Sequence, residues 1–171
     1  TSQHMKDAYH KAYRDLSPDF IFAFPAYNVR STEINAVIGR NHLKRLDSEI
    51  AKRNQHLKTF LDNLDPKKYQ TDFALDGCSN YAFTLVLVHS FKERAEQVIK
   101  KLTDLKVEFR RGLSGGGNQL RQPYLRRLFG EEYKNYPNTE HVHFNGFYIG
   151  NYPDLEESKI KKLCTELNGI N

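Results

Sequence analysis

The sequence predicts an α/β (α+β) fold in which helices pack against a mixed sheet and a long helix leads into it. Apolar residues recur at helical spacing over residues 34–64 and stop at Asp65-Pro66. A strand, a helix and a second strand follow one another over residues 81–110. A further strand and a final helix occupy residues 144–169. These observations together predict one sheet with its helices layered on it.

The size and composition of the chain are those of one folded domain without a membrane segment. A length of 171 residues with 39% hydrophobic residues is enough for one apolar core. Its 10 Tyr and 11 Phe residues are spread along the chain, which argues against intrinsic disorder. No window reaches the roughly 20 apolar residues that a membrane-spanning helix needs. We therefore expect a soluble protein.

The two cysteines, Cys78 and Cys164, lie far apart and belong to no CxxC or clustered Cys/His pattern. This spacing predicts neither a disulfide framework nor a zinc site. A reducing, cytoplasmic location is therefore expected.

Positive charge is concentrated in one part of the sequence. The formal net charge of +5 is compatible with nucleic-acid binding, because Lys and Arg neutralise backbone phosphates. No basic tail or known nucleic-acid-binding motif is present, however, and acidic residues are interleaved through the predicted helices. A local anionic ligand such as a diphosphate explains a local cluster better than a duplex does. The cluster consists of five arginines: Arg110, Arg111, Arg121, Arg126 and Arg127.

The N-terminal part of the chain divides into a lead-in segment and one long helix. Residues 1–30 are polar or irregular and are interpreted as a lead-in segment. Ser31 or Thr32 is a favourable N-cap for a connecting helix over residues 31–65, bent near Gly39. A helix of this length has more apolar face than a small domain covers. We expect that face to contact a missing part of the protein or a partner subunit.

Residues 66–171 are predicted to form a small C-terminal α/β domain. Tyr81–Val88 is rich in strand formers, and a capping box follows that opens a helix over residues 91–105. Val107–Arg110 is a second short strand. If the two strands lie parallel in one sheet, the connection between them is right-handed.

The remainder of this domain alternates between short elements. Short helical stretches are expected around residues 124–136, and a strand is expected over residues 144–149. The last helix begins near Asp154 and ends at Gly169.

Asn28 and Arg30 precede the predicted start of the long helix. Free backbone N–H groups and the helix dipole favour an anion at such a place, and an arginine fork suits phosphate oxygens. The alternative is that Asn28 caps the helix and Arg30 is a solvated surface charge. The local sequence leaves both interpretations open.

Ser114–Gly117 is a glycine-rich segment between two groups of arginines. Its backbone N–H groups are suited to a phosphate, but it lacks the Gly-Lys-Ser/Thr ending of a P-loop, so a plain surface loop is the alternative. Asn118 and Gln119 follow it and offer neutral hydrogen bonds to a sugar.

His141 and His143 would share one face of a strand, a spacing that suits two ligands of one metal. No third ligand stands nearby, so we expect structural or interface histidines and no metal site. The sequence also shows no Ser/His/Asp or Cys/His nucleophile arrangement.

Three segments resemble one enzyme family in their order and spacing. Residues 22–47 read FAFPAYNVRSTEINAVIGRNHLKRLD, a turn with tyrosine and asparagine that feeds a long helix. Residues 107–111 read VEFRR, and residues 146–153 read GFYIGNYP. Together they resemble the region after the cofactor-binding half in the DegT/DnrJ/StrS family of pyridoxal-phosphate (PLP) dependent sugar aminotransferases and dehydratases.

The resemblance implies the small C-terminal domain of the aspartate-aminotransferase type fold, in an enzyme that works as a homodimer. It implies that Asn28 contacts the PLP phosphate of the neighbouring subunit. It makes Arg30, Arg110, Arg111 and Asn118 candidates for the sugar-nucleotide side of the site. The family's Schiff-base lysine lies in the half that is absent from this chain, and no lysine present stands in the family's motif.

The sequence therefore predicts the C-terminal piece of a PLP-dependent enzyme that modifies a nucleotide-linked keto-deoxy sugar in surface polysaccharide or deoxysugar biosynthesis. Within the family it most resembles GDP-4-keto-6-deoxymannose 3-dehydratases, although an aminotransferase remains open. The piece alone is expected to be inactive, with no catalytic residue of its own. The alternative function is a stand-alone nucleotide- or nucleic-acid-binding module without catalysis.

Overall fold

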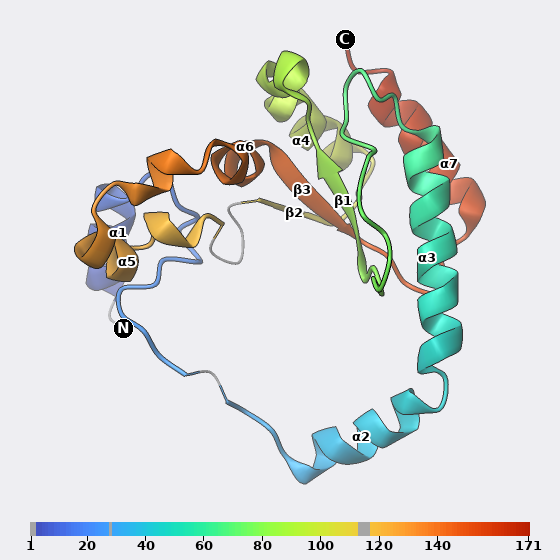
Figure 1. The fold of residues 1–171 in the computed structure, drawn as a ribbon, viewed down its shortest axis with the longest axis horizontal. Helices are drawn as coiled ribbons and strands as arrows, with labels where there is room; N and C mark the ends of the chain where they lie inside the picture. Colours follow the sequence, from blue (N-terminus) through green and yellow to red (C-terminus); the bar gives the residue numbers. More distant parts are fainter. Residues whose placement is uncertain (1–2, 28, 113–116) are drawn as a thin grey trace. The chain divides into compact units, whose positions relative to one another are not determined.

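A computed structural model describes residues 3–27, 29–112 and 117–171 (Figure 1). Contacts within the chain divide it into two compact units. Unit 1 comprises Thr1–Tyr27 and Arg110–Phe147, and unit 2 comprises Asn28–Phe109 and Tyr148–Asn171. Residues 1–27 of the predicted lead-in thus group with residues 110–147.

Unit 2 contains the predicted connecting helix, but as two helices. Thr32 is the N-cap of the first one, and its hydroxyl oxygen accepts a hydrogen bond of 3.4 Å from the Asn35 backbone N–H. Gly39 lies inside this helix, and the helical stretch is interrupted at Lys44 and Arg45 instead. Arg45 has non-helical backbone angles as N-cap of the second helix, and its side chain pairs with Glu49 at 2.5 Å. The two helices are α2 (Glu33–Leu43) and α3 (Leu46–Asn63).

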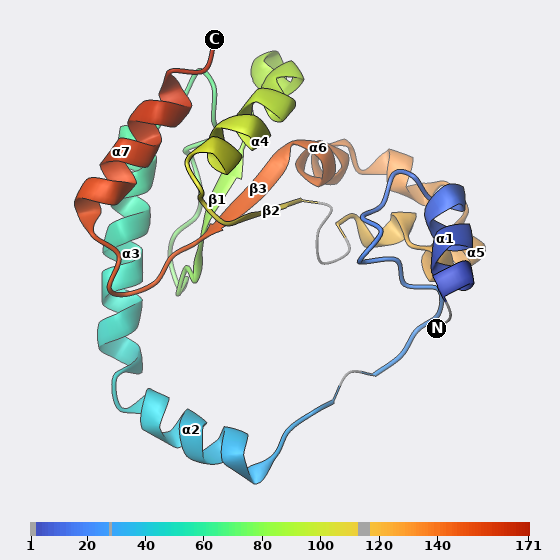
Figure 2. The same ribbon diagram turned by 180° about the vertical axis from the view of Figure 1, so that it is seen from behind.

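The apolar core of unit 2 lies largely between α3 and the last helix, α7 (Glu157–Asn168), which run side by side in Figures 1 and 2. Phe60 of α3 stacks on Phe83 of the first strand, with ring centroids 4.6 Å apart. The buried phenol of Tyr69 donates a hydrogen bond of 2.9 Å to the Leu167 carbonyl oxygen. These contacts explain why the apolar stripes of both helices were visible in the sequence.

The sheet has three strands in the order β1-β3-β2. The Asn151 N–H, just after β3, donates to the Tyr81 carbonyl, just before β1. The Gly112 N–H, just after β2, donates to the Gly146 carbonyl at the start of β3. Both neighbouring pairs are therefore antiparallel, where the sequence predicted a mixed sheet. The strands are β1 (Ala82–Val86), β2 (Phe109–Arg111) and β3 (Gly146–Gly150).

The connection between β1 and β2 contains the predicted helix. It begins as a 3-10 helix, η1 (His89–Arg94), and continues as α4 (Ala95–Asp104). Val98 and Leu102 of α4 are fully buried. Because β3 lies between β1 and β2, the two strands are not hydrogen-bonded neighbours.

Asn151 links three parts of unit 2. Its side-chain amide donates to the carbonyls of Arg53 and Asn80, both at 2.9 Å, and its Oδ1 lies 3.2 Å from His56 Nδ1. The residue is 3% exposed. The Gly-Asn pair that follows β3 therefore has a structural role, since it joins α3 to the chain entering β1.

Unit 1 is built from short elements around few buried apolar side chains. Among its described residues, the large apolar side chains in the core are Leu16, Tyr133 and Phe147, while Gln122 and His143 are buried polar residues. The strand predicted from residue 144 begins only at Gly146, because α6 extends to Asn145. The helices of unit 1 are α1 (Gln3–Ala12), η3 (Gln119–Arg121), α5 (Pro123–Phe129), η4 (Glu132–Asn135) and α6 (Pro137–Asn145).

Candidate functional site

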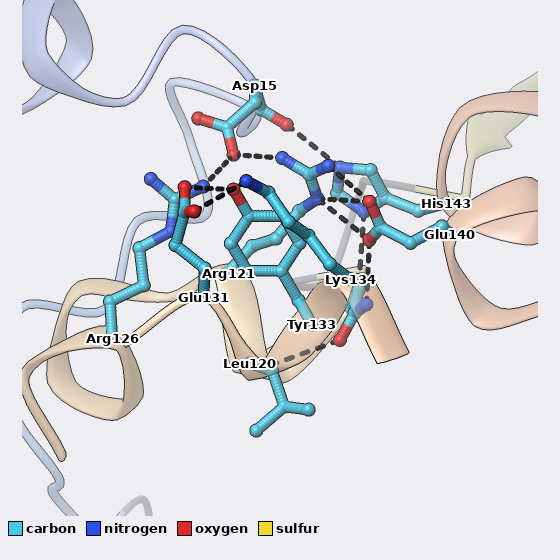
Figure 3. Close-up of polar contacts among 10 residues, drawn as sticks. Asp15, Leu120, Arg121, Arg126, Glu131, Tyr133, Lys134, Glu140 and His143 are labelled. Atoms are coloured by element: carbon cyan, nitrogen blue, oxygen red, sulfur yellow. Dashed lines mark hydrogen bonds and ion pairs between the residues drawn. The ribbon is translucent and has the colours of Figure 1, made fainter. Parts of the chain in front are cut away.

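The arginine-rich segment of unit 1 is organised around Arg121, which lies between two carboxylates (Figure 3). Arg121 Nη1 is 2.6 Å from Asp15 Oδ2. Its Nε is 2.8 Å and 3.0 Å from the two Glu140 oxygens, and its Nη2 also donates to Glu140. The guanidinium lies 4.2 Å from the ring centroid of Tyr133. Arg121 is thus held by a fork-to-carboxylate pair and by stacking, the geometry in which arginine binds most strongly.

Asp15 also binds a second arginine. Its Oδ2 lies 2.5 Å from Arg126 Nη2, and the Arg126 guanidinium lies 4.8 Å from the Tyr133 ring centroid. Two guanidinium groups and two carboxylates therefore compensate one another inside unit 1. This pairing leaves Arg121 and Arg126 committed to internal contacts.

The five-arginine cluster predicted from the sequence is consequently divided. Arg127 is exposed and donates to the Tyr9 hydroxyl at 3.2 Å. Arg110 is exposed and Arg111 is half-buried at the end of β2. Arg110 and Arg111 are the two members of the cluster that were also predicted to bind the substrate.

The electrostatic environment of this network follows from burial and pairing. Burial alone would raise the pKa of Glu140, but hydrogen bonds from Arg121 and Asn118 outweigh it and lower that pKa. The pKa of Arg121 is raised, chiefly by its hydrogen bonds to Glu140. Both groups therefore stay charged over the whole physiological pH range.

His143 connects the network to the lead-in segment. Its Nδ1 accepts a hydrogen bond of 3.0 Å from the Asn118 backbone N–H. Since a carbonyl oxygen can only accept, Nε2 carries the proton and donates to the Asp15 carbonyl at 2.8 Å. His143 is 1% exposed and lies on a helix, so the strand spacing that suggested two metal ligands does not occur.

Asn118 is one of the predicted substrate-binding residues. It is 4% exposed, its side-chain amide donates to Glu140 Oε1 at 2.7 Å, and its Oδ1 accepts from the Leu120 backbone N–H at 3.2 Å. It also caps η3. The side chain is therefore engaged within unit 1.

The remaining predicted residues lie elsewhere. Arg30 is exposed and belongs to unit 2, two residues before the N-cap of α2. Asn28 lies outside the described residues, as do residues 113–116 of the predicted phosphate loop.

Three residues with structural roles in unit 1 were not predicted from the sequence: Asp15, Glu140 and Gln122. Gln122 is fully buried, accepts from the Phe22 N–H at 2.8 Å and donates to the Phe20 carbonyl at 3.0 Å. Its partners lie 100 and 102 residues away in the sequence, so no local pattern reveals them. The lead-in is attached to unit 1 by these contacts together with those of Asp15.

The described parts of the chain contain no group of three or more His, Cys, Asp or Glu side chains placed to hold a metal ion. Within the same residues, no helix has both the length and the apolar character needed to cross a membrane.

The sequence profile of the DegT/DnrJ/EryC1/StrS aminotransferase family matches residues 2–168. The chain belongs to this family. Two relatives are GDP-4-keto-6-deoxy-D-mannose 3-dehydratases: one from Escherichia coli, 27% identical over 83% of the chain, and one from Yersinia pseudotuberculosis, 29% identical over 90%. A GDP-perosamine synthase from another strain of Escherichia coli is 22% identical over 83% of the chain. The matches span 37%, 39% and 37% of these relatives, well under half of each.

Solved structures of similar proteins confirm the fold. The Escherichia coli GDP-4-keto-6-deoxy-D-mannose 3-dehydratase with bound hydrated PLP aligns with a TM-score of 0.63 at 23% identity, over 88% of this chain and 39% of that one. An aminotransferase from Psychrobacter cryohalolentis aligns with a TM-score of 0.61 at 20% identity, over 95% of this chain and 45% of that one. The predicted fold class, a part of the aminotransferase-type fold in the DegT/DnrJ/EryC1/StrS family, is thereby confirmed.

Proposed function

We propose that this chain is the C-terminal part of a PLP-dependent enzyme that modifies a nucleotide-linked keto-deoxy sugar in surface polysaccharide or deoxysugar biosynthesis. The enzyme acts as a 3-dehydratase or as an aminotransferase. The observation that carries the proposal is the family match over residues 2–168, together with two 3-dehydratase relatives that align over 83% and 90% of the chain.

PLP would be held mainly by the part of the enzyme that this chain lacks. The residues present fit a contribution to its phosphate: Thr32 starts a helix of 11 residues, the exposed Arg30 stands two positions before it, and Asn28 precedes both. When bound, PLP supplies the electron sink for the reaction of the sugar. The role of this chain is to bind and orient, with Asn28 on the phosphate of the neighbouring subunit's cofactor.

Arg30, Arg110 and Arg111 are each proposed as a ligand of the substrate, as the family resemblance implies. Planar guanidinium groups bind diphosphate oxygens in a bidentate manner, which suits a nucleotide-linked sugar. Asn118 was also predicted to bind the substrate. Its hydrogen bonds to Glu140 and His143 hold it in place within unit 1.

The complete enzyme, supplied with PLP, glutamate and GDP-4-keto-6-deoxymannose, is expected to convert the sugar. Mass spectrometry of the product distinguishes loss of the 3-hydroxyl from gain of an amino group. A holoenzyme that leaves GDP-, UDP- and dTDP-linked keto-deoxy sugars unchanged would contradict the proposal.

The matched control is the chain of residues 1–171 alone, which is expected to be inactive. A covalent bond to PLP needs an activated lysine, and the family places that lysine outside this chain. Borohydride treatment after incubation with PLP should therefore leave no lysine of the chain labelled, as read by mass spectrometry. Stoichiometric labelling of one lysine would show that this chain does contain the lysine that bonds PLP.

The alternative, a stand-alone nucleotide- or nucleic-acid-binding module, is not favoured, because the family match extends over nearly the whole chain. A reducing, cytoplasmic location is proposed for the enzyme. In support, neither Cys78 nor Cys164 is disulfide-bonded, and burial raises the pKa of the Cys164 thiol to about 12, which makes it unreactive.

We also propose that the complete enzyme is a homodimer. Helix α2 has no buried residue, and its apolar side chains are among the most exposed of unit 2: Ile34 is 72%, Val37 68% and Leu43 66% exposed. An apolar face of this kind is typical of an interface, and two-fold dimers are the commonest soluble oligomers. Light scattering on the complete enzyme is expected to give twice the subunit mass. A monomer at micromolar concentration would contradict both the dimer and the placement of Asn28 at a partner's cofactor.

A further inference from the structure

We infer that Asn118, Glu140 and His143 are positioning residues of the proposed nucleotide-sugar site, and that α6 fixes where Arg111 and Asn118 lie. The inference rests on the proposed function, because it is that function which makes Arg110 and Arg111 ligands. It concerns unit 1 alone, which contains all of these residues.

The first contact with α6 lies directly after Arg111. The Gly112 N–H donates to the carbonyl of Gly146 in β3 at 2.5 Å, which brings Gly112 against the end of α6. A Cβ atom at Gly112 would come within 2.1 Å of the Val142 carbonyl oxygen, and one at Gly146 within 2.6 Å of the same atom. Only glycine allows this approach, so the backbone at Gly112, just after β2, packs directly against the backbone of the last turn of α6.

The second contact lies at Asn118. Its backbone N–H donates to His143 Nδ1 and its side-chain amide donates to Glu140 Oε1. Glu140 and His143 belong to α6, as does Val142. One short helix therefore contacts the chain at Gly112, next to Arg111, and again at Asn118.

His143 can do this only as a neutral imidazole. A backbone N–H cannot accept, so Nδ1 must be unprotonated for the bond to Asn118 to exist. Adding a proton at Nδ1 would place two donors face to face. Acid should therefore break the hydrogen bond between the Asn118 backbone and His143, while Glu140 and Arg121 keep their charges.

The groups that face the imidazole are Arg121, Glu140 and the backbone and side chain of Asp15. Burial lowers the pKa of His143 below its usual value of 6.5, and the nearby Arg121 charge acts in the same direction. The hydrogen bond to the Asp15 carbonyl and the charges of Glu140 and Asp15 oppose this. The unfolded chain thus takes up the proton first, so stability is present above about pH 6.5 and is lost as the pH falls from there towards the folded pKa.

The test uses the complete enzyme, with GDP as the probe in calorimetric titrations. His143→Leu, which removes the acceptor, is expected to raise the Kd for GDP about tenfold at about pH 7.5. His143→Asn offers Oδ1 in place of Nδ1 and is expected to bind like the wild type. His10→Asn, at an exposed position of α1, is the control.

The pH dependence of GDP affinity is the second measurement. It would not change on substitution of a residue with a purely structural role. Between about pH 7.5 and about pH 5.5, the affinity of the wild type for GDP should fall more steeply than that of His143→Asn, which cannot titrate. Titration of GDP itself affects both proteins equally. A His143→Leu enzyme that melts at a lower temperature but binds GDP normally, or equal pH profiles, would overturn the inference. A wild type that binds none of GDP, UDP and dTDP would instead overturn the proposed function, and the inference with it.

Discussion

Replacing Arg121 by methionine is expected to destabilise unit 1 by about 3 kcal/mol, the low end of the cost of removing one partner from a buried ion pair, because these side chains are partly buried. The Arg121 side chain is 12% exposed and pairs with Asp15 and Glu140, whose side chains are 23% and 19% exposed. Methionine fills a similar volume against Tyr133 but leaves Glu140 with Asn118 as its remaining polar partner. Few apolar side chains are buried in unit 1 to offset the loss.

Hydrogen exchange measured by mass spectrometry can locate the effect. Amides of residues 117–127 and 137–147 should exchange faster in Arg121→Met, while those of α3 and α7 should be unchanged, since the two units have separate cores. Arg127→Met is the matched control, because Arg127 is exposed. Equal protection in Arg121→Met and Arg127→Met would show that the ion pairs contribute little to the stability of unit 1.

The sequence predicted unit 2 well, for a physical reason. Its helices are stabilised by apolar stripes that pack on one core, and such stripes are periodic in the sequence. The buried faces of α3, α4 and α7 coincide with the predicted stripes. The N-cap at Thr32 was also predictable, because capping depends on residues only three apart.

Unit 1 was not predictable in the same way. Asp15 reaches Arg121 and Arg126 across 106 and 111 residues, and His143 reaches the Asp15 carbonyl across 128. Neither periodicity nor composition reveals such long-range pairs. From the sequence alone, the lead-in was therefore interpreted as irregular and its arginine partners as a basic cluster. The charges that seemed to await an anion were in part already balanced by Asp15 and Glu140.

The break between α2 and α3 shows a related limit. Glycine has a lower helix propensity than arginine, yet Gly39 lies inside α2, where a Cβ atom would meet no other atom within 4 Å. The break occurs at Arg45, where contacts to His42 and Glu49 stabilise a new helix start. Propensity ranks residues one at a time, whereas the side-chain pairing at Arg45 decides the outcome here.

Asn28→Ala is expected to weaken PLP binding by the complete enzyme about tenfold to a hundredfold, as losing one hydrogen bond to a charged phosphate costs roughly 1.5–3 kcal/mol. Arg30→Ala is expected chiefly to impair turnover of the nucleotide sugar, because its guanidinium is proposed to bind the substrate. The measurements are the Kd for PLP, the KM for the sugar nucleotide, and the melting temperature without PLP.

Thr32→Ala is the matched control for the helix. Thr32 is the N-cap of α2, and its removal should lower stability by about 0.5–2 kcal/mol. It should leave the affinity for PLP close to that of the wild type, because its hydroxyl is engaged with Asn35. The two variants thus separate loss of a phosphate ligand from loss of a cap within four residues of the same chain.

The pair of variants decides between the two interpretations of Asn28. If Asn28 binds the cofactor phosphate, Asn28→Ala should lower PLP affinity with little change in melting temperature, the reverse of Thr32→Ala. An Asn28→Ala enzyme that melts lower but binds PLP normally would behave like a second cap variant and would remove Asn28 from the site. Arg30, Arg110 and Arg111 would then have to account for anion binding alone, and the reason for placing this turn at a neighbouring subunit's cofactor would be lost.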